Sequence, residues 1–140
     1  MTPNTKNEKI IKPWGEEILF TPSDLKYTLK MISVNEGQRL SLQSHTEKVE
    51  TFVLISGNMD LVIGPDLDHL ETIKMEPKIG YNVAVNTIHR MIGGVGGGVV
   101  IEGSTPETGV TVRYQDDYNR PDETEAMRQE KNRGWNPDNN

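Results

Sequence analysis

Short strand-forming stretches, each ended by a turn signal, constrain the fold of this chain most strongly. Residues 27–34 are rich in β-branched and aromatic side chains and end at Asn35-Glu36-Gly37, and in residues 39–45 leucines alternate with polar residues. Further strands are predicted over residues 16–20, 50–55, 59–63, 70–75, 81–85, 88–91, 99–102 and 109–114. Many short strands separated by turns favour an all-β sandwich or barrel.

Two glycine-containing segments are predicted to interrupt these strands. Ser56-Gly57-Asn58 has the composition of a tight turn, which would join residues 50–55 and 59–63 as a hairpin. Residues 93–98 are almost all glycine and are predicted to form a flexible hairpin or loop.

The length of 140 residues suits one domain with one core. Residues 1–11 are predicted to be a flexible N-terminal arm, and residues 12–120 the β-barrel domain. Residues 121–140 are almost all polar or charged, so they are predicted to be a tail that docks on a partner or stays mobile.

Composition excludes several classes of function. The chain has no cysteine, which rules out disulfides and thiolate metal sites. Its net charge of -6 argues against nucleic-acid binding, although a few clustered cations can still bind a small phosphorylated ligand. No apolar run approaches the ~20 residues of a membrane helix, and residues 1–9 lack a secretion signal, so we expect a cytoplasmic protein without membrane contact.

Four residues are candidates for a metal site. Gln43 and His45 are two apart and so share one face of a strand, and Glu50 begins the next predicted strand. His89 would come from a distant strand, and together these side chains offer nitrogen and oxygen donors for a divalent ion. In the alternative interpretation Gln43 and His45 are exposed polar residues of a half-buried strand. His69 lies among acidic residues of a predicted loop and is expected to be solvated.

The spacing of Gly37, Gln43-Ser44-His45, Glu50 and Gly57 matches the first motif of the cupin superfamily, with Gln43 where many cupins have His. With the further matches, residues 11–120 resemble the C-terminal cupin domain of type II mannose-6-phosphate isomerases and its stand-alone relatives. These further matches are Lys12-Pro13-Trp14-Gly15, His89-Arg90, Val112-Arg113 and residues 116–120. Between Gly80 and His89 the chain lacks the Pro and Gly of the second cupin motif.

This resemblance implies a cupin barrel, that is, a double-stranded β-helix or jelly roll. It also implies one divalent ion, zinc or alternatively Mn, Fe, Co or Ni, ligated by Gln43, His45, Glu50 and His89. The implied activity is a sugar-phosphate isomerase of the mannose-6-phosphate isomerase type. Two alternatives stay open: a non-catalytic sugar- or metabolite-binding cupin, and a metal-dependent cupin of the dioxygenase type.

An isomerase also needs a base and cations. Glu102, on a predicted strand, is the candidate base, and Arg90, which follows a predicted ligand, is a second candidate catalytic residue. Lys30, Arg39 and Arg113 are candidates for binding the substrate phosphate. Each of these residues can also be a surface charge or part of a salt bridge. Trp14 and Tyr118 either stack on a sugar or pack the barrel.

We expect a homodimer, because closed two-fold dimers are the commonest assembly. Residues 8–20 are the candidate segment for exchange between the two chains. Light scattering at micromolar concentration should give the mass of two chains, and the mass of one chain would contradict this expectation.

Overall fold

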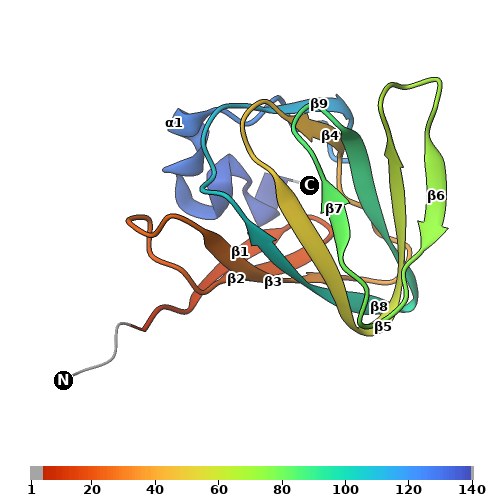
Figure 1. Ribbon diagram of the computed structural model, residues 1–140. Coiled ribbons are helices and arrows are strands. Elements are labelled where there is room, and N and C mark those ends of the chain that lie inside the picture. The colour runs from red at the N-terminus through yellow and green to blue at the C-terminus, as the bar shows by residue number, and fades with distance from the viewer. Residues whose placement is uncertain (1–4, 140) are drawn as a thin grey trace.

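The computed structural model describes residues 5–139, which form one curled, nine-stranded antiparallel sheet (Figure 1). The strands are β1 (Glu8–Lys12), β2 (Gly15–Leu19), β3 (Thr28–Val34), β4 (Leu42–His45), β5 (Glu50–Gly64), β6 (Glu71–Lys74), β7 (Tyr81–Val83), β8 (Ile88–Ser104) and β9 (Thr111–Gln115). A short helix, α1 (Glu125–Arg128), and two 3-10 turns, η1 (Lys131–Gly134) and η2 (Pro137–Asn139), follow them. Among the described residues no helix has the length and apolar character that a membrane span requires.

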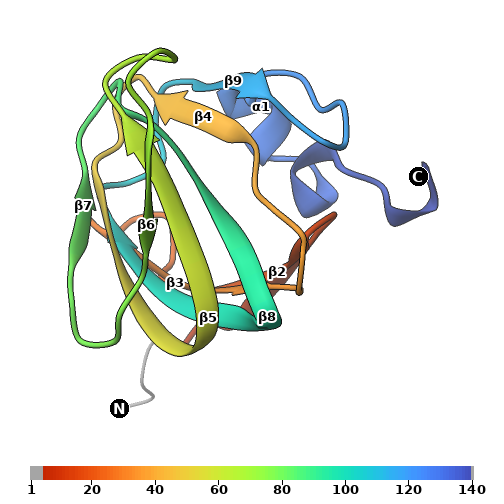
Figure 2. The same cartoon turned by 90° about the vertical axis from the view of Figure 1, so that its right-hand side faces the viewer.

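Strand β8 is a central strand of this sheet and pairs with β3, β4 and β5. Its second half pairs with β3 on one side and with β5 on the other, and its first half pairs with β5 and, through His89, with Gln43 of β4. The sheet therefore curls on itself, and β4 and β9 lie across one end of the barrel (Figure 2). This closure brings the end of β4 and the beginnings of β5 and β8 together.

The structure corrects both predicted interruptions. Strand β5 continues through residues 56–58 with two register shifts, and β8 continues through residues 93–98. Gly57 pairs with Gly98, and a Cβ on Gly57 would lie 2.3 Å from the carbonyl oxygen of Gly97. These glycines therefore allow two long strands to approach closely and bend, a role that turn-like composition does not distinguish from a hairpin.

The core lies inside the curled sheet. Alternate residues of the strands point inward, among them Ile32 and Val34 of β3 and Phe52 and Leu54 of β5. Trp14 is also buried in this core, so it packs the barrel. Tyr118 is partly buried against the same cluster.

Both ends of the chain differ from the sequence prediction. Within the expected N-terminal arm, β1 pairs with β2 and Ile10 is buried; residues 1–4 lie outside the described part. The C-terminal segment (residues 121–139), predicted to dock on a partner or stay mobile, folds back beside β1 and β9 of its own chain (Figure 1). The backbone N–H of Ile11, for example, donates a hydrogen bond to Asn132 Oδ1 at 3.0 Å.

Gly57 and Gly96 share the same φ angle, so a comparison of the two distinguishes backbone strain from steric crowding. Gly57 and Gly96 both have φ +77°, but a Cβ at Gly96 meets no atom within 4 Å. We expect Gly96→Ala to lower the free energy of unfolding by about 1 kcal/mol because of its left-handed backbone. Gly57→Ala should lower it by about 1–3 kcal/mol more, because its methyl group also collides with β8. Equal losses in urea unfolding would contradict this view of the bend.

Candidate metal centre

His45, Glu50 and His89 converge at one point inside the barrel. Nε2 of His89 lies 2.7 Å from Glu50 Oε1, and Nε2 of His45 lies 3.2 Å from the same oxygen. His45 ends β4, Glu50 begins β5 and His89 lies near the start of β8, and all three residues are buried. The structure thus brings these three residues together as predicted, despite the missing Pro and Gly before His89. We call them the triad.

The converging atoms of the triad have the features of an ion site. Among the described residues, Nε2 of His45, Nε2 of His89 and Oε1 of Glu50 are buried without a hydrogen-bond partner. Nδ1 of His89 lies 2.9 Å from the carbonyl oxygen of Thr87, which can only accept, so in the neutral ring the lone pair of Nε2 faces Glu50. Nδ1 of His45 lies 3.0 Å from Thr111 Oγ1, which can hold that ring in the same tautomer. The triad can therefore bind a metal ion.

Charges around the triad favour the protonation states that a metal requires. Burial lowers the pKa of His45, which keeps its ring neutral. Burial alone would raise the pKa of Glu50, but the ammonium of Lys48, 3.2 Å from Glu50 Oε2, holds it well below its usual range. A carboxylate beside two imidazoles is the donor set of many divalent metal sites.

Gln43, the fourth predicted ligand, lines the same cavity as the two histidines. It is paired with His89 across the sheet, and its Oε1 accepts a hydrogen bond from Ser41 Oγ at 2.7 Å. Its side chain is thus near the triad but bound to a neighbour. Its role as a ligand stays a prediction.

The cavity beside the triad is small and cationic. Its volume is about 50 Å³, which holds only a few water molecules. Although the whole chain is acidic, more cations than carboxylates line this cavity. The cations are Lys12, Lys30, Lys48, Arg90, Arg113, Arg120 and Arg133, and the carboxylates are Glu17, Glu102, Glu107 and Glu123.

Glu102, the predicted base, lies in this cavity close to the triad. Lys48 Nζ is 3.3 Å from Glu102 Oε2 and 3.2 Å from Glu50 Oε2, so one ammonium bridges the two carboxyl groups. Burial raises the pKa of Glu102 to about 7, against the opposing effect of Lys30 and Lys48. Its carboxyl group can therefore exchange a proton near neutral pH.

Three of the predicted cations line the cavity, and each is bound to other groups of the protein. Lys30 Nζ lies 2.6 Å from Glu107, and Arg90 donates from Nε to the carbonyl oxygen of Leu40. Arg90 also donates to Gln115, and Arg113 donates to Ser41 and to the Pro121 carbonyl. These residues therefore contribute to both the shape and the charge of the cavity.

Two other predicted residues lie away from the cavity. Arg39 makes a two-pronged contact with Asp117 at 2.6 and 2.8 Å, and its side chain is 35% exposed. Its place next to a barrel strand is as predicted, but its guanidinium turns to the surface loop that carries Asp117. His69 is exposed beside Asp66, as the sequence predicted.

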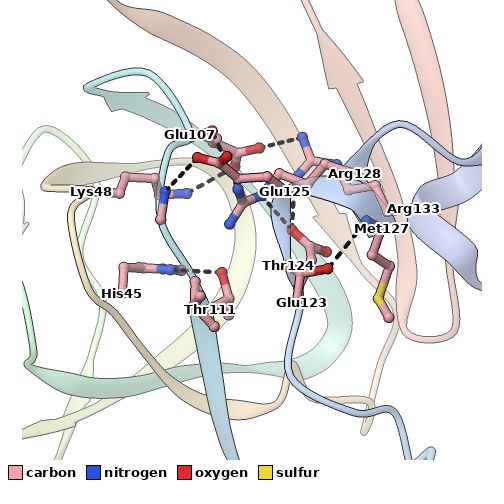
Figure 3. A network of polar contacts seen from close by, with 12 residues as sticks. His45, Lys48, Glu107, Thr111, Glu123, Thr124, Glu125, Met127, Arg128 and Arg133 are labelled. Atoms are coloured by element: carbon pink, nitrogen blue, oxygen red, sulfur yellow. Dashed lines mark hydrogen bonds and ion pairs between the residues drawn. The ribbon is translucent and has the colours of Figure 1, made fainter.

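Sequence reasoning missed a second group of charges, which are buried or largely buried. Glu107 accepts from Lys48 at 3.0 Å and pairs with Arg133 of the C-terminal segment (Figure 3). Arg133 also pairs with Glu123 of the same segment at 3.3 Å. Lys48 lies two residues before Glu50, a spacing that could have drawn attention to it. The partners of Glu123 and Arg133 are distant in sequence, and no local pattern marks them.

Comparison with known proteins identifies the sequence family. The family model described as Mannose-6-phosphate isomerase C-terminal matches residues 2–101. No curated protein sequence matches this chain.

Solved structures share the fold at low sequence identity. The capsular polysaccharide assembling protein CapF from Staphylococcus aureus matches with a TM-score of 0.64 and 12% identity, covering 84% of this chain and 34% of CapF. The S161A mutant of Bacillus subtilis oxalate decarboxylase OxdC matches with a TM-score of 0.65 and 17% identity, over 76% and 30% of the two chains. KdgF from Halomonas sp. matches with a TM-score of 0.58 and 11% identity, over 69% and 83%. The chain spans about a third of CapF, and the predicted cupin jelly-roll fold is confirmed.

The buried His89 and the exposed His69 provide a matched test of the triad. His89→Ala and Glu50→Ala should abolish stoichiometric binding of zinc, because each removes a converging donor. Thr111→Val should weaken binding about 10–100-fold, because it frees the ring of His45. His69→Ala should leave binding unchanged, since that side chain is exposed on a loop. Calorimetric titration measures all four, and equal affinity of the His89 and His69 variants would refute the site.

Proposed function

Since the chain belongs to the mannose-6-phosphate isomerase C-terminal family, we propose that it is a metal-dependent sugar-phosphate isomerase. The reaction we assign to it interconverts mannose 6-phosphate and fructose 6-phosphate, or a closely related pair. The family match supports this proposal, and so does the chemistry of the cavity beside the triad.

One observation supports the proposal most strongly. The buried carboxyl group of Glu102 has a pKa of about 7 and contacts the same Lys48 ammonium as Glu50 of the triad. Aldose–ketose isomerisation requires a base that takes a proton from one carbon and returns it to the next. Glu102 is suited to this because a group that titrates near the working pH both accepts and releases a proton readily. Glu50 is not, since its own pKa is held well below its usual range.

The charge of the cavity supports an anionic substrate. Lys30, Arg90 and Arg113 line it and provide positive charge for a phosphate group. Arg39 does not take part in this role, because it pairs with Asp117 at the surface. A divalent ion held by the triad, for which zinc is our first choice, supplies Lewis-acid stabilisation of negative charge on substrate oxygen.

Replacing Glu102 tests the proposed base. In metal-loaded protein, Glu102→Gln should lower kcat for mannose 6-phosphate by about 100-fold or more with little change in KM, because the amide cannot accept the proton. Glu71→Gln makes the same change at an exposed position of β6 and should leave kcat unchanged. Solvent exchange at C2 of the sugar is the readout.

Two results would contradict the proposal. The first is an absence of exchange on every member of a sugar-phosphate panel with metal-loaded wild-type protein. If calorimetry then detects sugar binding, the chain is a binding module. The second is full activity of Glu102→Gln, which would remove Glu102 as the base.

A further inference from the structure

We propose that the C-terminal segment is a lid that closes the triad's cavity and opens to admit the substrate. This inference rests on the proposed function for the identity of the ligand. The arrangement of the segment itself is independent of that function.

The small size of the cavity favours a wall that moves when a ligand enters. Its volume of about 50 Å³ is far below the roughly 300 Å³ at which pockets for small-molecule ligands begin. Glu123 and Arg133 of the C-terminal segment form part of the wall. The strands that form much of the remaining wall are tied into the sheet by continuous pairing, so the C-terminal segment is the part of the wall that can leave at the lowest cost.

Charge, more than apolar burial, holds this segment in place. Neither α1 nor η1 contains a buried residue. Arg133 pairs with Glu107 of the barrel and with Glu123, and Arg128 Nε lies 3.0 Å from Glu123 Oε1. Opening α1 and η1 therefore exposes little apolar surface of their own, and water can solvate the charges that separate.

The backbone of the segment is strained at the residue that reaches the barrel. Asn132 and Arg133 have φ of 50° and 54°, the left-handed conformation that side chains other than glycine disfavour. Asn132 Oδ1 accepts from the N–H of Ile11, and the guanidinium of Arg133 pairs with Glu107. These contacts maintain the conformation, and its relaxation favours opening.

The same segment is linked to a predicted metal ligand. Glu123 and Thr111 exchange both backbone hydrogen bonds, at 3.0 and 2.9 Å. Thr111 Oγ1 in turn lies 3.0 Å from Nδ1 of His45 (Figure 3). When the segment is closed, it therefore steadies the residue that orients His45.

Hydrogen exchange tests whether the segment opens by itself. In wild-type protein without added metal, amides of residues 121–139 should exchange far faster than those of β8. Arg133→Gln should raise the exchange of residues 121–139 and of Thr111 by about tenfold or more, because it leaves the largely buried Glu107 without this partner. Exchange in β8 should not change, which shows that the barrel stays folded.

Lys131→Gln is the matched control, because it removes one positive charge from η1 at an exposed position. It should leave exchange unchanged, and Arg133→Lys should fall between wild type and Arg133→Gln. The lid would be refuted if residues 121–139 exchanged only together with β8, or if both glutamine variants behaved alike. Neither result depends on isomerase activity.

Quenching of Trp14 tests whether the same opening exposes the cavity. Trp14 lines the cavity and is 2% exposed, whereas Trp135, the other tryptophan, lies in the segment itself. In a Trp135→Phe background, acrylamide should quench Trp14 several-fold more strongly after Arg133→Gln than after Lys131→Gln. Equal quenching in the two proteins would show that the segment does not close this cavity.

Discussion

The rest of the structure depends on the burial of one carboxylate, that of Glu50, against two imidazoles. A buried charge is costly unless other charges compensate it. Lys48 provides that compensation, and Lys48 is itself balanced by Glu102 and Glu107. Glu107 is then shared with Arg133 of the C-terminal segment. A continuous series of compensating charges therefore runs from the triad to the end of the chain.

This series connects the fold with the proposed chemistry. The curled sheet brings the beginnings of β5 and β8 to the end of β4 and so brings the triad together. The converging atoms of the triad have no hydrogen-bond partners among the described residues. Burial in the same region raises the pKa of Glu102 to about 7. An ion at the triad would add positive charge to an already cationic cavity, which suits an anionic substrate. The C-terminal segment completes the wall and so controls access.

The barrel strands could be predicted because alternation along a strand follows from its period-two geometry. The triad was predicted by resemblance to the cupin motif, since His45, Glu50 and His89 lie on three different strands. The continuity of β5 could not be predicted, because the glycine that lets a strand bend resembles one that ends it. The docking of the C-terminal segment was also missed, since its polar composition is typical of disorder and its partners lie elsewhere in the chain.

X-ray absorption spectroscopy of protein loaded with one zinc ion per chain tests the central claim most directly. The account predicts a mixed shell in which imidazole nitrogens at about 2.0–2.1 Å are accompanied by oxygen ligands. Multiple scattering from two imidazole rings should be present and should be lost in part when His89 is replaced by alanine. A shell of oxygen atoms alone, unchanged by that substitution, would show that the triad is not where this protein holds a metal.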